Sequence, residues 1–124
     1  IADLAGVPLV ALKSGQRWRE RMEAIFTQAG VTPRIAVETG STVIALELVR
    51  RGLGAMVVDR ICSSLTPTDL VLRPLTPEVW TEYAAISSVG RESAPTHDFI
   101  AVLRRCVQEL REAREDLAAS VSII

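Results

Sequence analysis

Residues 7–58 alternate between short apolar runs and longer stretches with helical periodicity, and this alternation constrains the fold more than any other feature. The run VPLVAL (7–12) predicts a buried strand, RIAVE (34–38) predicts a second strand, and AMVV (55–58) predicts a third. Strands that alternate with helices are joined by right-handed crossovers, which favour a parallel sheet. The sequence therefore predicts an α/β fold with a mainly parallel sheet flanked by helices.

Two amphipathic segments between these strands predict the helices. In the first segment, five apolar residues share the face expected to meet the core: Trp18, Met22, Ile25, Phe26 and Ala29. Five charged residues are expected on the other, solvated face: Arg17, Arg19, Glu20, Arg21 and Glu23. The second segment has an apolar stripe of four residues: Ile44, Ala45, Leu48 and Val49. Glu47 and Arg51 have the i,i+4 spacing of a helical ion pair, and Gly30 and Gly52 predict the two helix ends.

The glycines of Gly52-Leu53-Gly54 follow the second helix and precede the third strand. A loop that binds the phosphates of a dinucleotide has the opposite order, because it follows a strand and precedes a helix whose N-terminus faces the pyrophosphate. The third glycine of a G-x-G-x-x-G pattern would also fall on Val57. The two glycines are therefore interpreted as a helix end and a strand start, and no cofactor is predicted.

The rest of the chain predicts two more strands and a last helix. The stretch RICSSLTPTD (60–69) is a turn-rich connection with room for a short helical turn, and strands are expected at 70–75 and at about 79–89. Pro95 suits the first turn of the last helix. That helix has seven residues on its apolar stripe: Phe99, Ile100, Leu103, Cys106, Val107, Leu110 and Leu117.

Composition and charge argue against several classes of protein. A chain of 124 residues that is 48% hydrophobic suits one ordinary domain. A formal net charge of −1 does not suit direct binding to a phosphate backbone. The apolar runs are far shorter than the roughly 20 residues of a membrane helix, and the start IADLAGVPLV lacks the basic flank of a signal peptide. We therefore expect a soluble, cytoplasmic protein with no membrane partner.

The residues that could carry chemistry do not form a catalytic or metal-binding set. The single histidine, His97, has no nucleophile at a matching spacing and is expected to be an exposed helix residue. Cys62 and Cys106 have no CxxC spacing and are expected to be reduced, structural thiols. Ser14 and Ser41 lack the G-x-S-x-G pattern of a hydrolase. The sequence predicts neither an enzyme nor a metal site.

The carboxyl edge of the predicted sheet is the expected place for a ligand. In open parallel sheets, ligands bind beyond the carboxyl ends of the strands, where loops lead into helix N-termini with free N–H groups. The candidate residues follow the three strands in turn: Lys13, Ser14, Gly15 and Gln16, then Thr39, Gly40, Ser41 and Thr42, then Val58 and Asp59. These residue types suit a carboxylate or another small anion, but they are also ordinary N-caps, and both interpretations stay open.

Several short segments occur in an order that resembles one family, the C-terminal effector-binding domain of LysR-type transcriptional regulators. The segments are DLAGVPLV (3–10), the x-P-x-I-x-x-E pattern at 32–38, LVRRGLG (48–54), LVLRPLTP (70–77) and THDFIAVLRR (96–105). None is specific alone, but their common order covers about residues 3–105.

The resemblance implies a periplasmic-binding-protein-like (type 2) fold, in which two α/β lobes enclose a small-molecule effector. Residues 1–75 would form the second lobe, and residues 76–124 the return strand and C-terminal helix of the first lobe. The family's cleft in this lobe matches Ser14–Arg17, Thr39–Thr42 and Val58 with Asp59, so it adds Arg17 to the candidate residues. The family usually has a proline after the buried strand, where this chain has Val58-Asp59. An acidic side chain there disfavours an anionic effector beside it.

The implied function is to sense an effector and so change the geometry of a DNA-bound oligomer. We expect a homodimer or a higher homo-oligomer, because residues 76–117 would expose apolar surface that the rest of the first lobe covers. DNA would be contacted only through a helix-turn-helix domain, which is absent from these residues, so the chain is expected to be a fragment. The alternative is a solute-binding protein of the same fold. A signal peptide before Ile1 would favour that alternative, and a helix-turn-helix would favour the regulator.

Overall fold

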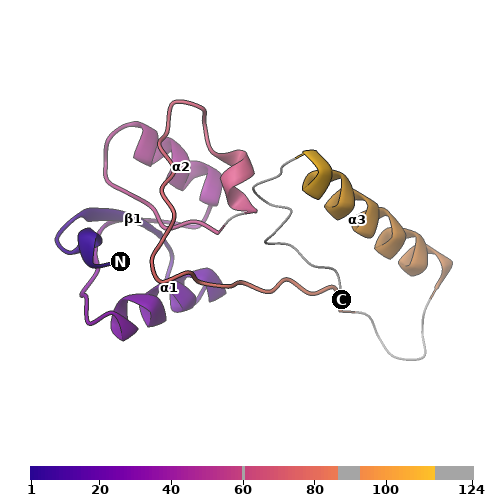
Figure 1. The fold of residues 1–124 in the computed structure, drawn as a ribbon, viewed down its shortest axis with the longest axis horizontal. Helices are drawn as coiled ribbons and strands as arrows, with labels where there is room; N and C mark the ends of the chain where they lie inside the picture. Colours follow the sequence, from indigo (N-terminus) through magenta and orange to yellow (C-terminus); the bar gives the residue numbers. More distant parts are fainter. Residues whose placement is uncertain (60, 87–92, 114–124) are drawn as a thin grey trace. The chain divides into compact units, whose positions relative to one another are not determined.

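The computed structural model describes residues 1–59, 61–86 and 93–113 of the chain (Figure 1). The elements in chain order are η1 (Ala2–Leu4), β1 (Pro8–Leu12), α1 (Arg17–Gln28), β2 (Arg34–Thr39), α2 (Thr42–Arg50), η2 (Cys62–Leu65) and α3 (Ala94–Ala113). They fall into two units, Ile1–Trp80 and Thr81–Ile124. The first unit contains a parallel strand pair with helices, which confirms the predicted α/β class. The predicted division at residue 75 between two lobes stays a prediction.

Strand β1 is central in a small parallel sheet. Its partner β2 runs parallel to it, with Pro8 opposite Arg34 and Leu12 opposite Thr39. On the other edge of β1, Ala55 forms one parallel bridge with Leu9. The predicted strand at 55–58 is therefore wrong as a regular strand, because its pairing ends at that bridge. Instead, the Val57 carbonyl accepts a hydrogen bond from the Trp18 indole, at 2.9 Å.

Helices α1 and α2 lie on opposite sides of β1 (Figure 1). The core between α1 and β1 consists of Leu9, Ala11, Met22, Ile25 and Phe26, with Ile1 and Val57 at its margin. Alternate residues of a strand point to opposite faces. Val10 and Leu12, which are also buried, therefore point toward α2, where Ala45 and Leu46 are buried. Burial on both faces explains why β1 reads as a continuous apolar run.

Three side chains of α1 and α2 lie elsewhere than their pattern predicts. Ile44 is 55% exposed, because Ala45 and Leu46 take the places that face the sheet. Ala29, at the end of α1, is exposed as well. Arg19 was expected in solvent but is buried among polar partners described below.

The predicted ion pair of α2 is confirmed. Arg51 Nε lies 2.8 Å from Glu47 Oε1, and Arg50 Nε lies 2.6 Å from the other oxygen of the same carboxylate. Glu47 therefore binds two arginines in the last turns of the helix.

Gly52 and Gly54 have different structural roles. Gly52 ends α2 with a φ of 79°, where its N–H donates to Val49 O at 2.8 Å and the N–H of Leu53 donates to Leu48 O at 3.2 Å. These two bonds form a Schellman motif, which confirms the predicted helix end. Gly54 has a φ of 151°, and a Cβ atom there would overlap the carbonyl oxygen of Pro8. Glycine at position 54 therefore allows the chain to approach β1 closely.

Residues 66–86 contain no regular strand in the part of the chain that the structure describes. The predicted strand at 70–75 is wrong, and so is the part of the 79–89 prediction that falls within the described residues; residues 87–89 lie outside them. Ile86, in the middle of that alternating pattern, is 94% exposed. A strand needs a neighbouring strand to satisfy its backbone groups, and none pairs with these segments in the described structure. The expected short helical turn is confirmed as η2.

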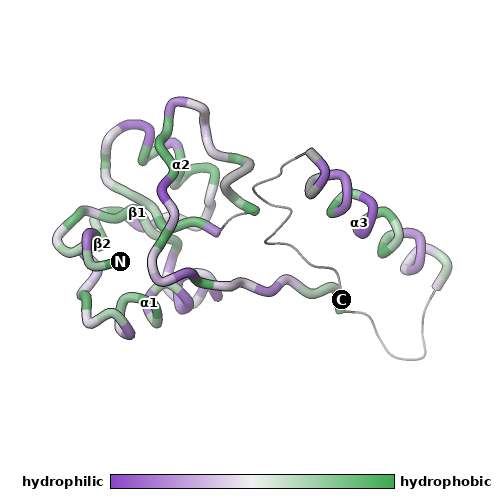
Figure 2. Tube along the Cα trace, viewed as in Figure 1, coloured by the Kyte–Doolittle hydropathy of each residue, from purple (hydrophilic) through white to green (hydrophobic). Residues whose placement is uncertain are grey.

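Helix α3 forms where the pattern predicts it, with Pro95 in its first turn. Apolar residues recur along it in Figure 2, yet its described apolar side chains are largely exposed. Phe99, for example, is 64% exposed. Leu117, the last residue of the predicted stripe, lies outside the described residues.

Candidate functional site

Two of the candidate loops meet at the carboxyl edge of the sheet. β1 leads through Ser14 and Gly15 into α1, and β2 leads through Gly40 into α2. The backbone N–H of Lys13 donates to Thr39 O at 2.9 Å. Gln16 Nε2 donates to Gly40 O at 3.4 Å. The structure therefore brings the segments 14–17 and 39–42 side by side, as parallel strands of similar length require.

In the described structure, neither N-cap side chain at this edge bonds to its helix. Gln16 is the N-cap of α1 and Ser41 the N-cap of α2, and neither makes a side-chain cap hydrogen bond to the described residues. The Thr39 hydroxyl is buried and accepts a hydrogen bond from the Ser41 N–H at 3.3 Å. This bond uses the backbone N–H of Ser41, and the Ser41 hydroxyl does not cap α2 in the described structure. The first-turn N–H groups of both helices keep the donor capacity that a cap would use.

The third candidate segment joins the others through Trp18. Val58 and Asp59 are half-buried and follow Val57, whose carbonyl is bonded to the indole at the start of α1. Asp59 Oδ1 accepts a hydrogen bond from the Cys62 N–H at 2.7 Å, which anchors the start of η2. The carboxylate therefore has a structural role in addition to its place at the edge.

Cys62, beside this segment, is a poor nucleophile. Burial, followed by the charge of Asp59 and its hydrogen bond, raises the pKa of the thiol to about 11. At neutral pH the sulfur is therefore a neutral thiol, which neither attacks electrophiles readily nor binds metal as a thiolate.

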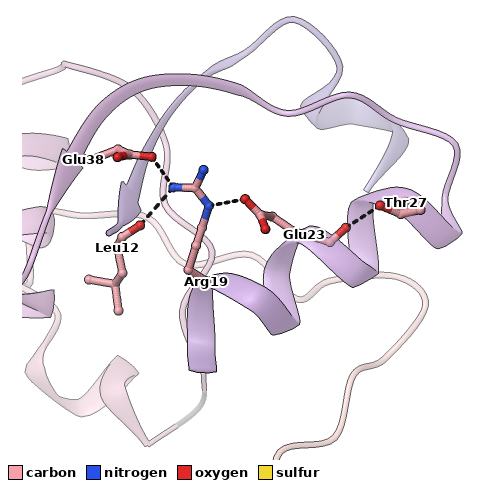
Figure 3. Close-up of polar contacts among 5 residues, drawn as sticks. All are labelled: Leu12, Arg19, Glu23, Thr27 and Glu38. Carbon is pink, nitrogen blue, oxygen red and sulfur yellow. Dashed lines mark hydrogen bonds and ion pairs between the residues drawn. The ribbon is translucent and has the colours of Figure 1, made fainter. Parts of the chain in front are cut away.

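Arg19 is the residue that the sequence interpretation missed (Figure 3). Its Nη1 donates to Leu12 O, the last carbonyl of β1, at 2.9 Å, and to Glu38 Oε1 on β2 at 2.5 Å. Its Nε donates to Glu23 Oε1, one turn further along α1, at 2.7 Å. Burial lowers the pKa of Arg19, but the bonds to Glu38 and Glu23 outweigh that effect and raise it above its usual value.

The sequence did contain a signal for this burial. Arg19 lies three residues before Met22 and seven before Phe26, so it shares their helical face. A charged residue on a core face indicates a buried partner, because an unpaired buried charge is costly. In this chain that partner was Glu38, in the second strand.

A separate groove lies on α1, away from these loops. It has a volume of about 320 Å³ and is lined by Arg21, Ile25 and Gln28 of α1, by its C-cap Ala29, and by residues 77–80. None of the candidate site residues lines it.

The described residues contain neither a metal-binding cluster nor a membrane-spanning helix. None of their His, Cys, Asp and Glu side chains form a group of three or more that could hold a metal ion. None of the described helices has the length and apolar character that crossing a membrane requires. His97 lies exposed on α3, as its position in the sequence predicts.

The chain matches a known protein family. Residues 1–108 match the family described as the LysR substrate binding domain. The match covers most of the chain, including all the candidate residues. No curated protein and no solved structure matches the chain.

Proposed function

The chain belongs to the family of LysR substrate binding domains, and on that basis we propose that it is the effector-sensing domain of a LysR-type transcriptional regulator. The observation that carries the proposal is the meeting of two loops and two uncapped helix N-termini at the carboxyl edge of a parallel sheet. This is the place where open α/β sheets bind small molecules. The proposed effector site comprises residues 14–17 and 39–42, together with Val58 and Asp59.

The proposed site lies in a periplasmic-binding-protein-like (type 2) fold. In this proposal residues 1–75 form the second lobe, and residues 76–124 return to the first lobe. The effector occupies the cleft between the lobes, and its binding changes how they close. The family match and the α/β architecture of Ile1–Trp80 support this assignment.

The polar groups at the edge favour a small polar molecule with hydrogen-bond acceptors. The first-turn N–H groups of α1 and α2 are donors, and the Ser41 and Thr42 hydroxyls donate or accept. Asp59 belongs to the third segment, and its carboxylate disfavours a negatively charged ligand group beside it. The effector we propose therefore places its acceptor atoms toward the two helices and a neutral or donating group toward Asp59.

The proposed mode of action is regulatory and non-enzymatic, in the cytoplasm. Lobe closure would alter the geometry of a homo-oligomer whose DNA contacts come from a helix-turn-helix domain. The exposed apolar face of α3, which includes Phe99, Val102 and Leu103, supports self-association.

A binding screen tests the proposal. Small carboxylic acids, amino acids and neutral sugars are screened for a thermal shift of the chain, and isothermal titration gives the Kd of each compound that stabilises it. Thr39→Ala and Ser41→Ala should each raise that Kd about fivefold, which corresponds to one lost hydrogen bond. Thr27→Ala is the matched control, because the Thr27 hydroxyl bonds the Glu23 carbonyl on the exposed part of α1.

Two outcomes contradict the proposal. If no compound class stabilises the chain, the sensing function fails. If a compound binds but Thr39→Ala and Ser41→Ala leave its Kd unchanged, the second loop is not part of the site. The alternative function, that of a solute-binding protein, would use the same site. The gene sequence before Ile1 distinguishes the two functions: a helix-turn-helix would indicate the regulator, and a signal peptide would indicate the solute-binding protein.

A further inference from the structure

We infer that Arg19 is the positioning residue of the candidate site, and that its bond to Glu38 holds the two loops in one arrangement. The inference deepens the proposed function, on which its meaning for ligand binding rests. Arg19 belongs to neither loop, so it acts through the residues that it holds.

The partners of Arg19 directly precede the loops. Leu12 lies two residues before Ser14, and Glu38 lies one residue before Thr39. One nitrogen, Nη1, donates to both Leu12 O and Glu38 Oε1. The end of β1, the end of β2 and the first turns of α1 are thus fixed to one planar group. A shift of either strand end relative to α1 would have to break one of these bonds.

Because Arg19 is buried, losing either of its bonds to the strand ends is costly. Arg19 is 8% exposed, so a guanidinium that lost a partner would keep little water in its place. Leaving a charged donor buried and unpaired costs more than the bond itself contributes. The arrangement in which both strand ends stay bonded is therefore strongly preferred over displaced ones.

The chain provides a matched control in Glu23. Glu23 and Glu38 bind the same guanidinium, at 2.7 and 2.5 Å, and their side chains are 45% and 44% exposed. Glu23 lies on α1, so its bond ties the helix to itself. Glu38 lies on β2, so its bond ties the helix to the sheet beside the second loop. A general effect of lost charge would be the same at both positions, whereas a positioning effect would appear at Glu38 alone.

The test compares Glu38→Gln with Glu23→Gln in the 124-residue chain by amide hydrogen exchange. The readout is the Lys13 N–H, which bridges the two loops through Thr39 O. The Phe26 N–H, in the core part of α1, reports unfolding of the whole unit. Glu38→Gln should speed exchange at Lys13 about fivefold relative to Phe26, which corresponds to about 1 kcal/mol. Glu23→Gln should leave that ratio within about twofold.

Arg19→Lys supplies a second variant. Lysine keeps the charge but lacks the planar fork that reaches two strands and a helix together. Arg19→Lys should speed exchange at the Lys13 N–H relative to the Phe26 N–H, as Glu38→Gln does. The inference is wrong if Glu23→Gln and Glu38→Gln change the ratio equally, or if Glu38→Gln speeds Lys13 and Phe26 alike, since either result indicates a general contribution to stability.

The exchange measurement needs no ligand, so it separates this inference from the proposed function. If a compound of the acid, amino-acid and sugar panel binds, its Kd should rise about fivefold in Glu38→Gln and stay unchanged in Glu23→Gln. If none binds, the proposed function fails, and the exchange ratio still decides whether Arg19 positions the loops.

Discussion

Helices α1 and α3 have the same kind of amphipathic pattern but different surroundings. Phe26 of α1 is fully buried between the helix and β1. Phe99 of α3, in an equivalent apolar stripe, is 64% exposed. The periodicity of a helix determines which residues share a face, and a second element determines whether that face is buried. Amphipathic spacing therefore predicts a helix reliably and a core only where its partner is also identified.

The largest expected effect comes from truncating Phe26, with the truncation of Phe99 as its comparison. Phe26→Ala removes a fully buried ring and should lower the free energy of unfolding by about 3–5 kcal/mol. Phe99→Ala should lower it by less than about 0.5 kcal/mol in dilute solution, because the ring is already in water. Urea denaturation followed by tryptophan fluorescence and far-ultraviolet circular dichroism measures both changes.

Measuring stability and association at several protein concentrations tests whether a second chain covers α3. If two chains cover each other's α3, Phe99→Ala should weaken association in sedimentation experiments, and its effect on stability should grow with concentration. A well-behaved monomer with a cooperative melt at all concentrations would contradict the proposed self-association.

A smaller effect is expected from backbone contact within the first unit. Gly54→Ala should destabilise the chain by about 2–4 kcal/mol, because the new methyl group overlaps Pro8 O at a backbone conformation that only glycine adopts readily. Gly40→Ala is the control, since a Cβ there meets no atom within 4 Å. Equal stability of the two variants, measured by urea denaturation, would show that the close approach of residue 54 to β1 does not contribute to the stability of this unit.

The smallest expected effect concerns the surface ion pairs of α2 and α3. Hydrogen bonds from Arg50 and Arg51 lower the pKa of Glu47 from 4.5 to about 2. Because the folded-state pKa is the lower one, the stabilisation is present above about pH 4.5 and is lost as the pH falls through 2. Glu47→Gln should therefore be less stable than the unmodified chain at pH 6 and equally stable below pH 2.

Urea denaturation from below pH 2 up to pH 6 checks this prediction. Glu109→Gln is the comparison on α3, where Arg105 Nε lies 3.8 Å from the carboxylate. It should change stability less than Glu47→Gln at pH 6, because the longer distance weakens the attraction. The effect of Glu47→Gln should also shrink in high salt, since the pair is exposed.

The order of elements in residues 7–50 was predictable because each pattern is local. Apolar runs and helical spacing placed β1, α1, β2 and α2, and glycine placed the ends of both helices. The strands expected at 55–58, at 70–75 and, within the described residues, at 79–86 failed because strand pairing depends on two segments. At Ala55 the partner is present for one bridge, and in the described part of 70–86 an alternating pattern finds no neighbour.

The candidate loops were placed by topology, and Arg19 was missed for a related reason. Parallel strands bring their carboxyl ends together, so 14–17 and 39–42 had to be neighbours once the sheet was predicted. Arg19 was assigned to solvent because charged residues usually lie there. Its burial depends on Leu12 O and Glu38, which lie on other elements. A charged residue spaced like its apolar neighbours is the pattern that would have revealed it.

The bond from the Trp18 indole to Val57 O has an optical consequence. The chain contains two tryptophans, and Trp80 is exposed. Replacing Trp80 by phenylalanine would leave Trp18 as the sole indole fluorophore, in a half-buried position where its N–H connects the start of α1 to the segment before Asp59. Its emission maximum and quenching would then report on the carboxyl edge of the sheet without any attached dye.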